Sequence, residues 1–309
     1  YSYAAGYAAA FEEAPGYGWT LPEAPRFDWA TLKRQRAQEI TRLNGVYQKL
    51  LDGAGVKTLT GWAQLVDGHT VSVSDTRYTA RHILVATGGM PAAPDMPGRE
   101  LAVVSDAMFD LPDFPKRLLV MGGGYIGCEF ASLFSGLGAH VTLVNRGAHI
   151  LNGFDDDVRE ALAREMGRQG IDLRMTAQVE TLRREGDGLV AMLSRGQQIE
   201  ADTVLLATGR KPNTAGMGLD AAGVKLDARG AVVVDAQYRS SVPSVLAIGD
   251  VSSRLALTPV ALAEAMVVVD QLFGDGQRRM GYDNVPTAVF THPNVATCGL
   301  TEAAARAKF

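Results

Sequence analysis

This sequence has very few cysteines, no long apolar run and no large excess of one charge. Only two of its 309 residues are cysteine, Cys128 and Cys298, and they lie far apart. Their scarcity excludes a disulfide framework and favours a reducing, cytoplasmic compartment. No apolar stretch approaches the roughly 18 residues that a membrane-spanning helix needs, so we expect no membrane partner.

The charge balance gives no sign of a nucleic-acid partner. Lys and Arg number 30 against 34 Asp and Glu, for a net charge of -4. Proteins that hold phosphate backbones gather basic residues on one face, and we expect no nucleic-acid binding here. With 47% hydrophobic residues and 34 glycines, the composition is typical of a soluble α/β enzyme, and the length suggests about two domains.

The chain opens on Tyr1, without Met, in an alanine-rich stretch. Tyr3, Tyr7 and Phe11 recur every fourth residue, which is a helical period. We therefore expect the chain to begin partway along a helix, as a fragment would. Glycines and prolines after residue 14 end this helix.

Short elements follow up to residue 115. A loosely amphipathic pattern predicts a second helix over residues 29–52. The period then changes to two, which predicts short strands; they cover residues 58–59, 63–65, 70–73 and 82–85. The proline-rich stretch 90–115 is predicted to be a linker.

Strands and helices alternate after residue 115. The expected order is strand 117–121, helix 125–137, strand 139–145, a helix capped by residues 155–157 that ends near Gly170, and strands 172–175, 189–193 and 203–207. Such alternation predicts a doubly wound parallel sheet.

The strongest motif lies between the first strand and helix of this series. Residues 122–127 read Gly-Gly-Gly-Tyr-Ile-Gly, a G-x-G-x-x-G pattern. Gly122 permits the tight turn, Gly124 lets the backbone approach a pyrophosphate, and Gly127 lets helix and strand pack closely. Ile126 belongs to the same turn, and the helix N-terminus favours phosphate there. The pattern predicts dinucleotide binding.

The end of the next strand bears on the choice of dinucleotide. An NAD site usually has a carboxylate about 20 residues after the glycines, on the ribose 2′-hydroxyl. Here that place holds Asn145, followed by Arg146. A guanidinium can pair with a 2′-phosphate, so NADPH is favoured. The alternative is a solvated surface arginine.

Three further strands end in small residues. Thr87 and Gly88 follow one of them, and Gly209 and Arg210 follow another. The third ends in Gly-Asp at Asp250, whose carboxylate could bind a sugar or ribityl hydroxyl. A plain strand exit or turn explains each of them as well.

In this order, these residues resemble the pyridine nucleotide–disulfide oxidoreductases, a family of FAD-dependent enzymes. The resemblance covers essentially the whole chain. It implies two Rossmann-like domains for FAD and NAD(P), with the NAD(P) domain inserted in the FAD domain, and the start of an α+β interface domain. The implied divisions are 1–113 and 237–284 for FAD, 114–236 for NAD(P), and 285–309 for the interface domain of a homodimer. The residues that carry it are 86–89, 122–129, 207–213, 247–250, 257–259 and 285–302.

The resemblance also implies roles for single residues. Tyr125 is similar to an aromatic gate over the flavin, and Glu129 to a carboxylate near the nicotinamide that pairs with a lysine. Without the family these two are a packing residue and a solvated helix residue. FAD would be bound by Gly61, Ala63, Thr87, Gly88, Asp250 and Thr258, and NADPH by Gly122, Gly124, Ile126, Gly127, Asn145, Arg146, Gly209 and Arg210.

Parts of the family's catalytic machinery are absent from these residues. We find no cysteine pair four residues apart, and no acid–base His and Glu of the interface domain. His292-Pro293 is interpreted as structural, since its neighbours match the start of that domain. Cys128 and Cys298 lack redox spacing and are predicted to be ordinary buried thiols.

Within the family, the chain resembles the glutathione reductase branch, whose substrate is glutathione disulfide. Tyr47 is similar to a tyrosine that lines the disulfide cleft; otherwise it is a core tyrosine. Two positions depart from the branch: Asn152 and Met266 stand where arginines are expected. The alternatives are a dihydrolipoamide dehydrogenase, a mercuric reductase, a pyridine nucleotide transhydrogenase, or a non-catalytic flavin-binding fragment.

Overall fold

The fold comes from a computed structural model that describes residues 1–252 and 254–309. The chain divides into two compact units. Unit 1 comprises Tyr1–Leu43, Pro91–Gly209 and Pro286–Phe309, and unit 2 comprises Asn44–Met90 and Arg210–Val285. The four-part division by residues 113, 236 and 284 stays a prediction. Among the helices of the residues described, none is both long and apolar enough to cross a membrane.

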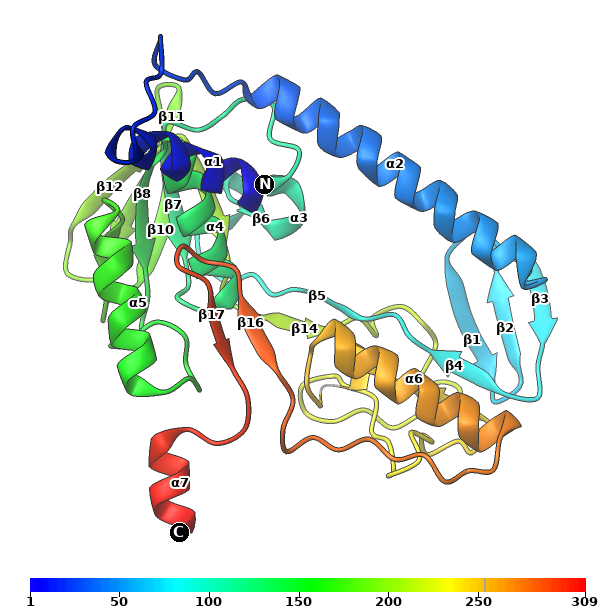
Figure 1. Ribbon diagram of the computed structural model, residues 1–309. Helices are drawn as coiled ribbons and strands as arrows, with labels where there is room; N and C mark the ends of the chain where they lie inside the picture. The colour runs from blue at the N-terminus through cyan, green and yellow to red at the C-terminus, as the bar shows by residue number, and fades with distance from the viewer. Residues whose placement is uncertain (253) are drawn as a thin grey trace. The chain divides into compact units, whose positions relative to one another are not determined.

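A parallel five-stranded sheet forms the centre of unit 1 (Figure 1). Its central strand, β7, ends in four consecutive buried residues, as expected for a strand covered on both faces. The strand order is β6 (Val103–Val104), β13 (Thr203–Leu206), β7 (Arg117–Met121), β8 (His140–Val144) and β9 (Asp172–Arg174).

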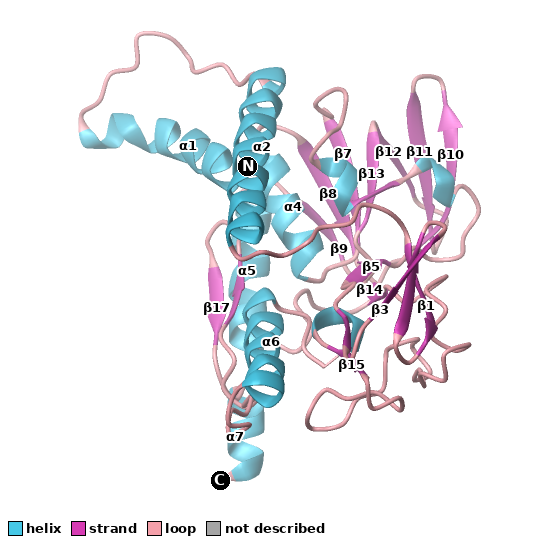
Figure 2. Ribbon diagram, turned by 90° about the vertical axis from the view of Figure 1, so that its right-hand side faces the viewer, coloured by secondary structure: helices cyan, strands magenta, loops and turns pink. Residues whose placement is uncertain are grey.

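The two faces of this sheet pack against different elements: helices on one face and a second sheet on the other. Leu118 and Val120 point into a core shared with the helices, whereas Leu119 and Met121 point into a core shared with an antiparallel sheet. This alternation is the two-residue period of a strand. Figure 2 shows α4 on one side of β7, β8 and β13, and the second sheet on the other. That sheet consists of β10 (Val179–Glu185), β11 (Gly188–Leu193) and β12 (Gln198–Ala201).

Among the helices of unit 1, α5 and α7 begin with a side-chain cap. Asp155 caps α5 by accepting the Asp157 N–H at 3.2 Å. Ala5 of α1 lies against Gly136 of α4, where a Cβ would come within 3.0 Å of the Ala5 methyl. The helices are α1 (Ser2–Glu13), η1 (Ala14–Tyr17), η2 (Arg99–Leu101), α3 (Ser105–Met108), α4 (Tyr125–Gly136), α5 (Asp156–Arg168) and α7 (Glu302–Lys308).

Two further elements complete this part of the chain. The helix α2 (Trp29–Gly53) runs from unit 1 into unit 2, and its Trp29 indole donates to the Leu111 carbonyl at 3.0 Å. A hairpin pairs β16 (Thr287–Val289) with β17 (Val295–Thr297). The cis His292-Pro293 dipeptide lies in its turn, and Thr291 Oγ1 donates to the Pro293 carbonyl at 2.6 Å.

Unit 2 is built around a smaller core that includes Leu65, Val85 and Val245. Two parallel strands, β4 (Ile83–Val85) and β15 (Val245–Ala247), run through it. The helix α6 (Thr258–Phe273) follows the short helix η3 (Gly249–Ser252). The other strands are β1 (Ala63–Asp67), β2 (Thr70–Val73) and β3 (Thr76–Thr79) in an antiparallel sheet, and the pair β5 (Gly89–Pro91) and β14 (Arg210–Pro212).

Three predictions of local structure were wrong. Residues 58–59 form no strand. The stretch 90–115 is more than a linker, because β6 within it joins the parallel sheet beside β13. The chain between β9 and β13 forms the antiparallel sheet β10–β12, of which only β11 was predicted. The fold class itself is confirmed: an α/β chain with a parallel sheet.

Candidate functional site

The glycine turn between β7 and α4 depends on the absence of side chains. Gly122 has φ +113°, and a Cβ there would lie 2.3 Å from the Ala207 carbonyl oxygen. A Cβ on Gly127 would lie 1.9 Å from the Gly122 carbonyl oxygen. Gly124, the N-cap of α4, has no atom within 4 Å of that position. The turn is therefore closed beneath the helix and open at its N-terminus.

A pocket of about 680 Å³ lies at this turn. Because Gly124 lines it, the pocket is at the end of α4 where N–H groups lack helical partners and the dipole favours an anion. Gly122, Asn145, Arg146 and Gly209, all predicted site residues, also line it. Ile126 packs against the core of unit 1. The remaining lining residues are Ala92, Ala93, Pro94, Met121, Gly123, Val144, Asn152, Ala177, Gln178, Val179, Ala207 and Thr208.

The Asn145 carboxamide binds the protein itself. Its Oδ1 accepts the Gly123 N–H at 3.2 Å, and its Nδ2 donates to the carbonyls of Gly147 at 3.3 Å and His149 at 2.8 Å. Asn145 thus ties the glycine turn to the loop after β8. Arg146, beside it, is exposed and carries the positive charge at this edge of the pocket.

Three neighbouring side chains on α4 have different surroundings. Tyr125 begins the helix and is 42% exposed. Glu129 is half-buried and accepts the Phe290 N–H at 2.9 Å, and burial raises the pKa of its carboxyl group. Cys128 is fully buried, and burial raises the pKa of its thiol to about 12. Cys298 is exposed, so the prediction that both thiols are buried was wrong for Cys298.

In unit 2, several predicted residues meet at the ends of β4, β5 and β15. Asp250 directly follows Gly249, and its Oδ2 lies 3.8 Å from Arg210 Nε. Arg210 Nη2 also donates to the Gly89 carbonyl at 2.6 Å. Arg210, which we predicted to bind NADPH, therefore contacts the predicted flavin carboxylate. Thr87 Oγ1 donates to the Asn213 carbonyl at 2.8 Å, and the Gly88 carbonyl accepts the Asn213 N–H at 2.9 Å.

The other predicted residues of unit 2 lie on separate elements. Gly61 precedes β1 with φ +157°, and a Cβ there would lie 2.8 Å from Val73 Cγ1. Ala63 begins β1 and pairs with Val73 of β2. Thr258 is the first residue of α6. Tyr47 lies on α2 and is 65% exposed, so it is not a core tyrosine in this structure.

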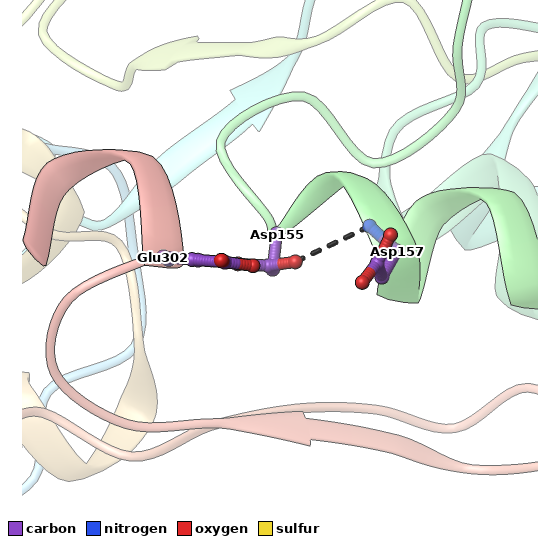
Figure 3. A group of neighbouring side chains, drawn as sticks. All are labelled: Asp155, Asp157 and Glu302. Atoms are coloured by element: carbon purple, nitrogen blue, oxygen red, sulfur yellow. Dashed lines mark hydrogen bonds between the residues drawn. The ribbon is translucent and has the colours of Figure 1, made fainter. Parts of the chain in front are cut away.

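Three carboxylates gather where α5 and α7 begin (Figure 3). One oxygen from each of Asp155, Asp157 and Glu302 lies within 4.8 Å of the others. Asp155 accepts the N–H groups of Asp157 and of Glu302, the latter at 2.8 Å. The three carboxylates lie together because Asp155 binds the first turns of both helices. Their proximity alone does not indicate a metal site.

Sequence reasoning missed part of the pocket wall. Thr208 Oγ1 donates to the Ala92 carbonyl at 2.8 Å, which holds residues 92–94 at the pocket. These residues were predicted to be linker, and the sequence Ala-Ala-Pro gave no signal of binding. Gln178 comes from the start of the unpredicted antiparallel sheet.

Comparison with known proteins agrees with this geometry. The family described as pyridine nucleotide-disulphide oxidoreductase matches residues 2–265. The chain belongs to this family. It is 44% identical over 307 residues to the glutathione reductase of Burkholderia cepacia and 39% identical over 301 residues to the chloroplastic/mitochondrial glutathione reductase of Pisum sativum. Membership implies FAD and NADPH as the cofactors.

Solved structures give the same assignment. The HOCl-induced flavoprotein disulfide reductase RclA from Escherichia coli superposes with a TM-score of 0.87 at 30% sequence identity, over 91% of this chain. The Burkholderia match covers 99% of this chain and 68% of the relative, and the Pisum match covers 97% of this chain and 54% of the relative. This chain covers 66% of the RclA chain.

Proposed function

We propose that the protein is an NADPH-dependent glutathione-disulfide reductase that works through FAD and a redox-active cysteine pair. The observation that carries the proposal is the pocket at the glycine turn, which presents Arg146 and no carboxylate at position 145. It occurs in a chain that is 44% identical to a glutathione reductase over 99% of its length. We further propose a cytoplasmic homodimer.

The turn would hold the pyrophosphate of NADPH and Arg146 its 2′-phosphate. Gly124 leaves the N-terminus of α4 open to the pocket, so backbone N–H groups can face an anion there. Arg146 supplies a charge-assisted hydrogen bond. Asn152 also lines the pocket, where a second arginine was expected. The loss of one such bond costs about 1.5–3 kcal/mol, which reduces the preference for NADPH without abolishing it.

Unit 2 would hold FAD. Asp250, with a side chain 28% exposed, would accept hydrogen bonds from ribityl hydroxyls. Gly88 has φ +70° and no atom within 4 Å of a Cβ position, so a cofactor could approach its backbone. The other FAD ligands in this proposal are Gly61, Ala63, Thr87 and Thr258. When bound, FAD supplies the hydride transfer that couples NADPH to a disulfide.

Two residues of α4 would work beside the flavin. Tyr125, partly exposed at the helix start, would cover the flavin until nicotinamide arrives. Glu129 would orient the nicotinamide end, and burial raises the pKa of its carboxyl group. A lysine partner would lower that pKa.

In this proposal the redox-active cysteine pair would lie outside residues 1–309. A disulfide-exchanging cysteine must ionise near neutral pH, and the thiol of Cys128, with a pKa of about 12, does not. Cys298 is far from Cys128 in sequence and directly follows β17 of unit 1. Neither residue can form the pair.

The substrate assignment depends on two exposed residues. Tyr47, exposed on α2, is available to line a cleft for glutathione disulfide. Met266, 46% exposed on α6, stands where an arginine for a glutathione carboxylate was expected. Met266 and the similarity to RclA favour a second candidate: a flavin disulfide reductase for another substrate.

Steady-state kinetics of the full-length protein separates these candidates. NADPH consumption is measured with glutathione disulfide, beside NADH and beside lipoamide. Rapid NADPH-dependent reduction of glutathione disulfide is the expected result. If NADPH is oxidised by an artificial acceptor while glutathione disulfide is ignored, the cofactor assignment stands and the substrate assignment falls.

An arginine variant tests the coenzyme site within the same assay. Arg146→Leu should raise the KM for NADPH by about tenfold or more, the usual weight of a charged hydrogen bond, and leave the KM for NADH unchanged. Arg168→Leu, in an exposed ion pair on α5 away from the pocket, is the matched control. An equal rise in the KM for NADPH and for NADH would show that Arg146 does not bind the 2′-phosphate.

A further inference from the structure

A buried carboxylate lies behind the turn that carries Asp250. Glu264, in the middle of α6, is only 1% exposed. Its Oε2 accepts the backbone N–H of Gly249 at 2.7 Å. Burying a charge costs free energy unless it is paired with hydrogen-bond donors. An apolar side chain at this position of α6 would be buried without that desolvation cost, so packing alone does not explain a glutamate here.

The second oxygen of Glu264 is held by an aromatic pair. Oε1 accepts the Tyr282 hydroxyl at 2.6 Å, and the hydroxyls of Tyr282 and Tyr238 lie 2.9 Å apart. Burial, followed by the bond to Glu264, raises the pKa of Tyr282, so it remains a phenol and a donor. Arg254 Nη1 donates to the Tyr282 hydroxyl at 3.3 Å, and its guanidinium lies over both rings.

This network fixes the backbone at one residue. Gly249 has φ +70°, and a Cβ there would press on Ala261 of α6 at 3.2 Å. Its carbonyl accepts the Ser252 hydroxyl at 2.9 Å, which closes the short helix η3. The N–H of Gly249 is held by Glu264, so the carboxyl group fixes the Ile248–Gly249 peptide plane, one residue before Asp250.

We propose that Glu264 is a positioning residue for the flavin site, which holds the Gly249–Asp250 turn so that the Asp250 carboxylate meets the ribityl chain of FAD. The inference rests on the proposed function, because Asp250 is a flavin ligand only there. Glu264 acts through the Gly249 backbone and touches no cofactor itself. Tyr282 holds its carboxyl group through a hydrogen bond, and Tyr238 and Arg254 in turn contact Tyr282.

The test is the FAD affinity of the apo form of the full-length protein, measured by quenching of flavin fluorescence. Glu264→Leu leaves the Gly249 N–H without its acceptor and should raise the Kd for FAD by about tenfold or more. Glu264→Gln can still accept from Gly249 and donate to Tyr282, so its Kd should stay within about threefold of wild type. Should the leucine variant not fold, Glu264→Asp, one methylene too short to reach both donors, replaces it.

Two controls separate positioning from general stability. Val267→Ala removes buried volume from the same helix, where Val267 is 1% exposed, and should leave the Kd for FAD unchanged while lowering stability. The double variant Glu264→Leu/Asp250→Ala should bind FAD no more weakly than Asp250→Ala alone, because Glu264 acts through Asp250. The Kd for NADP⁺ should be unchanged in all of these variants.

The outcomes are distinct. If Glu264→Leu folds and binds FAD as wild type does, or only as weakly as Val267→Ala, the positioning role is wrong and the proposed function stands. Additive effects of Glu264→Leu and Asp250→Ala would also overturn it. If the wild-type apo protein binds no FAD, the proposed function fails and this inference with it.

Discussion

Burial changes the chemistry of two adjacent residues on α4 in different ways. Cys128 has no exposed surface, and its thiol is kept protonated by a pKa of about 12. Glu129 is half-buried, with a raised pKa and one backbone donor, the Phe290 N–H. A buried thiol behaves as a small apolar group, whereas a half-buried carboxyl group with a raised pKa can still exchange a proton with solvent. Of these two residues, Glu129 is the one to which the proposed function gives a role in the reaction.

The two cysteines should differ in reactivity. At pH 8, iodoacetamide is expected to alkylate Cys298, which is exposed, and to leave Cys128 unmodified until the protein is denatured. Peptide mass spectrometry before and after denaturation measures this. Cys298→Ser supplies the control, since that variant should take up no label in the native state. Labelling of native Cys128 at a rate near that of Cys298 would contradict the burial.

Glu129 should make stability depend on pH in a defined direction. Because its folded pKa is raised, its favourable contribution is present below the unfolded value of about 4.3 and is lost as pH rises through the folded pKa. Glu129→Gln keeps an acceptor for the Phe290 N–H and avoids that loss. The variant should therefore gain stability relative to wild type between pH 4 and pH 8, as measured by urea denaturation.

Glu129→Leu is the control for this pH effect. It removes the acceptor as well as the charge, so it should be less stable than Glu129→Gln at every pH because the Phe290 N–H loses its partner. A difference between wild type and Glu129→Gln that does not change with pH would rule out the raised pKa.

At the scale of elements, the contact between β7 and α4 depends on one glycine of the helix. A methyl group on Gly127 would overlap the Gly122 carbonyl oxygen, whereas one on Gly167 of α5 would meet nothing within 4 Å. Gly127→Ala should destabilise the protein by about 1–3 kcal/mol, the usual cost of overpacking, and weaken NADP⁺ binding. Gly167→Ala should stabilise the protein by about 0.5–1 kcal/mol, because alanine lowers the conformational entropy of the unfolded chain.

Urea denaturation and NADP⁺ titration of both variants measure these opposite effects. The pair is matched because each replaces a helical glycine by alanine. If Gly127→Ala were as stable as wild type and bound NADP⁺ equally well, the close packing of helix on strand would not be needed for the turn.

Helices and strands could be predicted where their burial left a clear apolar pattern in the sequence. The strand β7 was predicted at its observed bounds, Arg117–Met121, because a strand buried on both faces leaves a continuous apolar run. The strand β10 was missed because charged residues such as Arg183 and Arg184 occupy its exposed end. The two-residue strand β6 is too short for any periodicity and forms only because β13 lies beside it.

At the scale of the whole molecule, the sequence could predict the glycine turn of the site better than its surroundings. The turn is local, so its glycines and the strand and helix around it sit together in the sequence. The pocket wall from residues 92–94 and Gln178 comes from distant segments with no binding signature. Arg210 shows the same limit: its proximity to Asp250 is a tertiary contact. The buried Glu264, unnoticed in the sequence, likewise has meaning only beside Gly249.

The final prediction concerns residues 1–309 taken as a whole. This chain contains the proposed coenzyme pocket and no closely spaced cysteine pair, so it should bind NADP⁺ and fail to reduce glutathione disulfide. Calorimetric titration measures the first property, and Arg146→Leu should weaken it as it does in the full-length protein. The second is measured as NADPH oxidation that depends on glutathione disulfide. Turnover by this chain would mean that Cys128 or Cys298 is redox-active, and it should then vanish in the corresponding Cys→Ser variant. Binding without turnover would place disulfide chemistry outside these residues while leaving coenzyme recognition within unit 1.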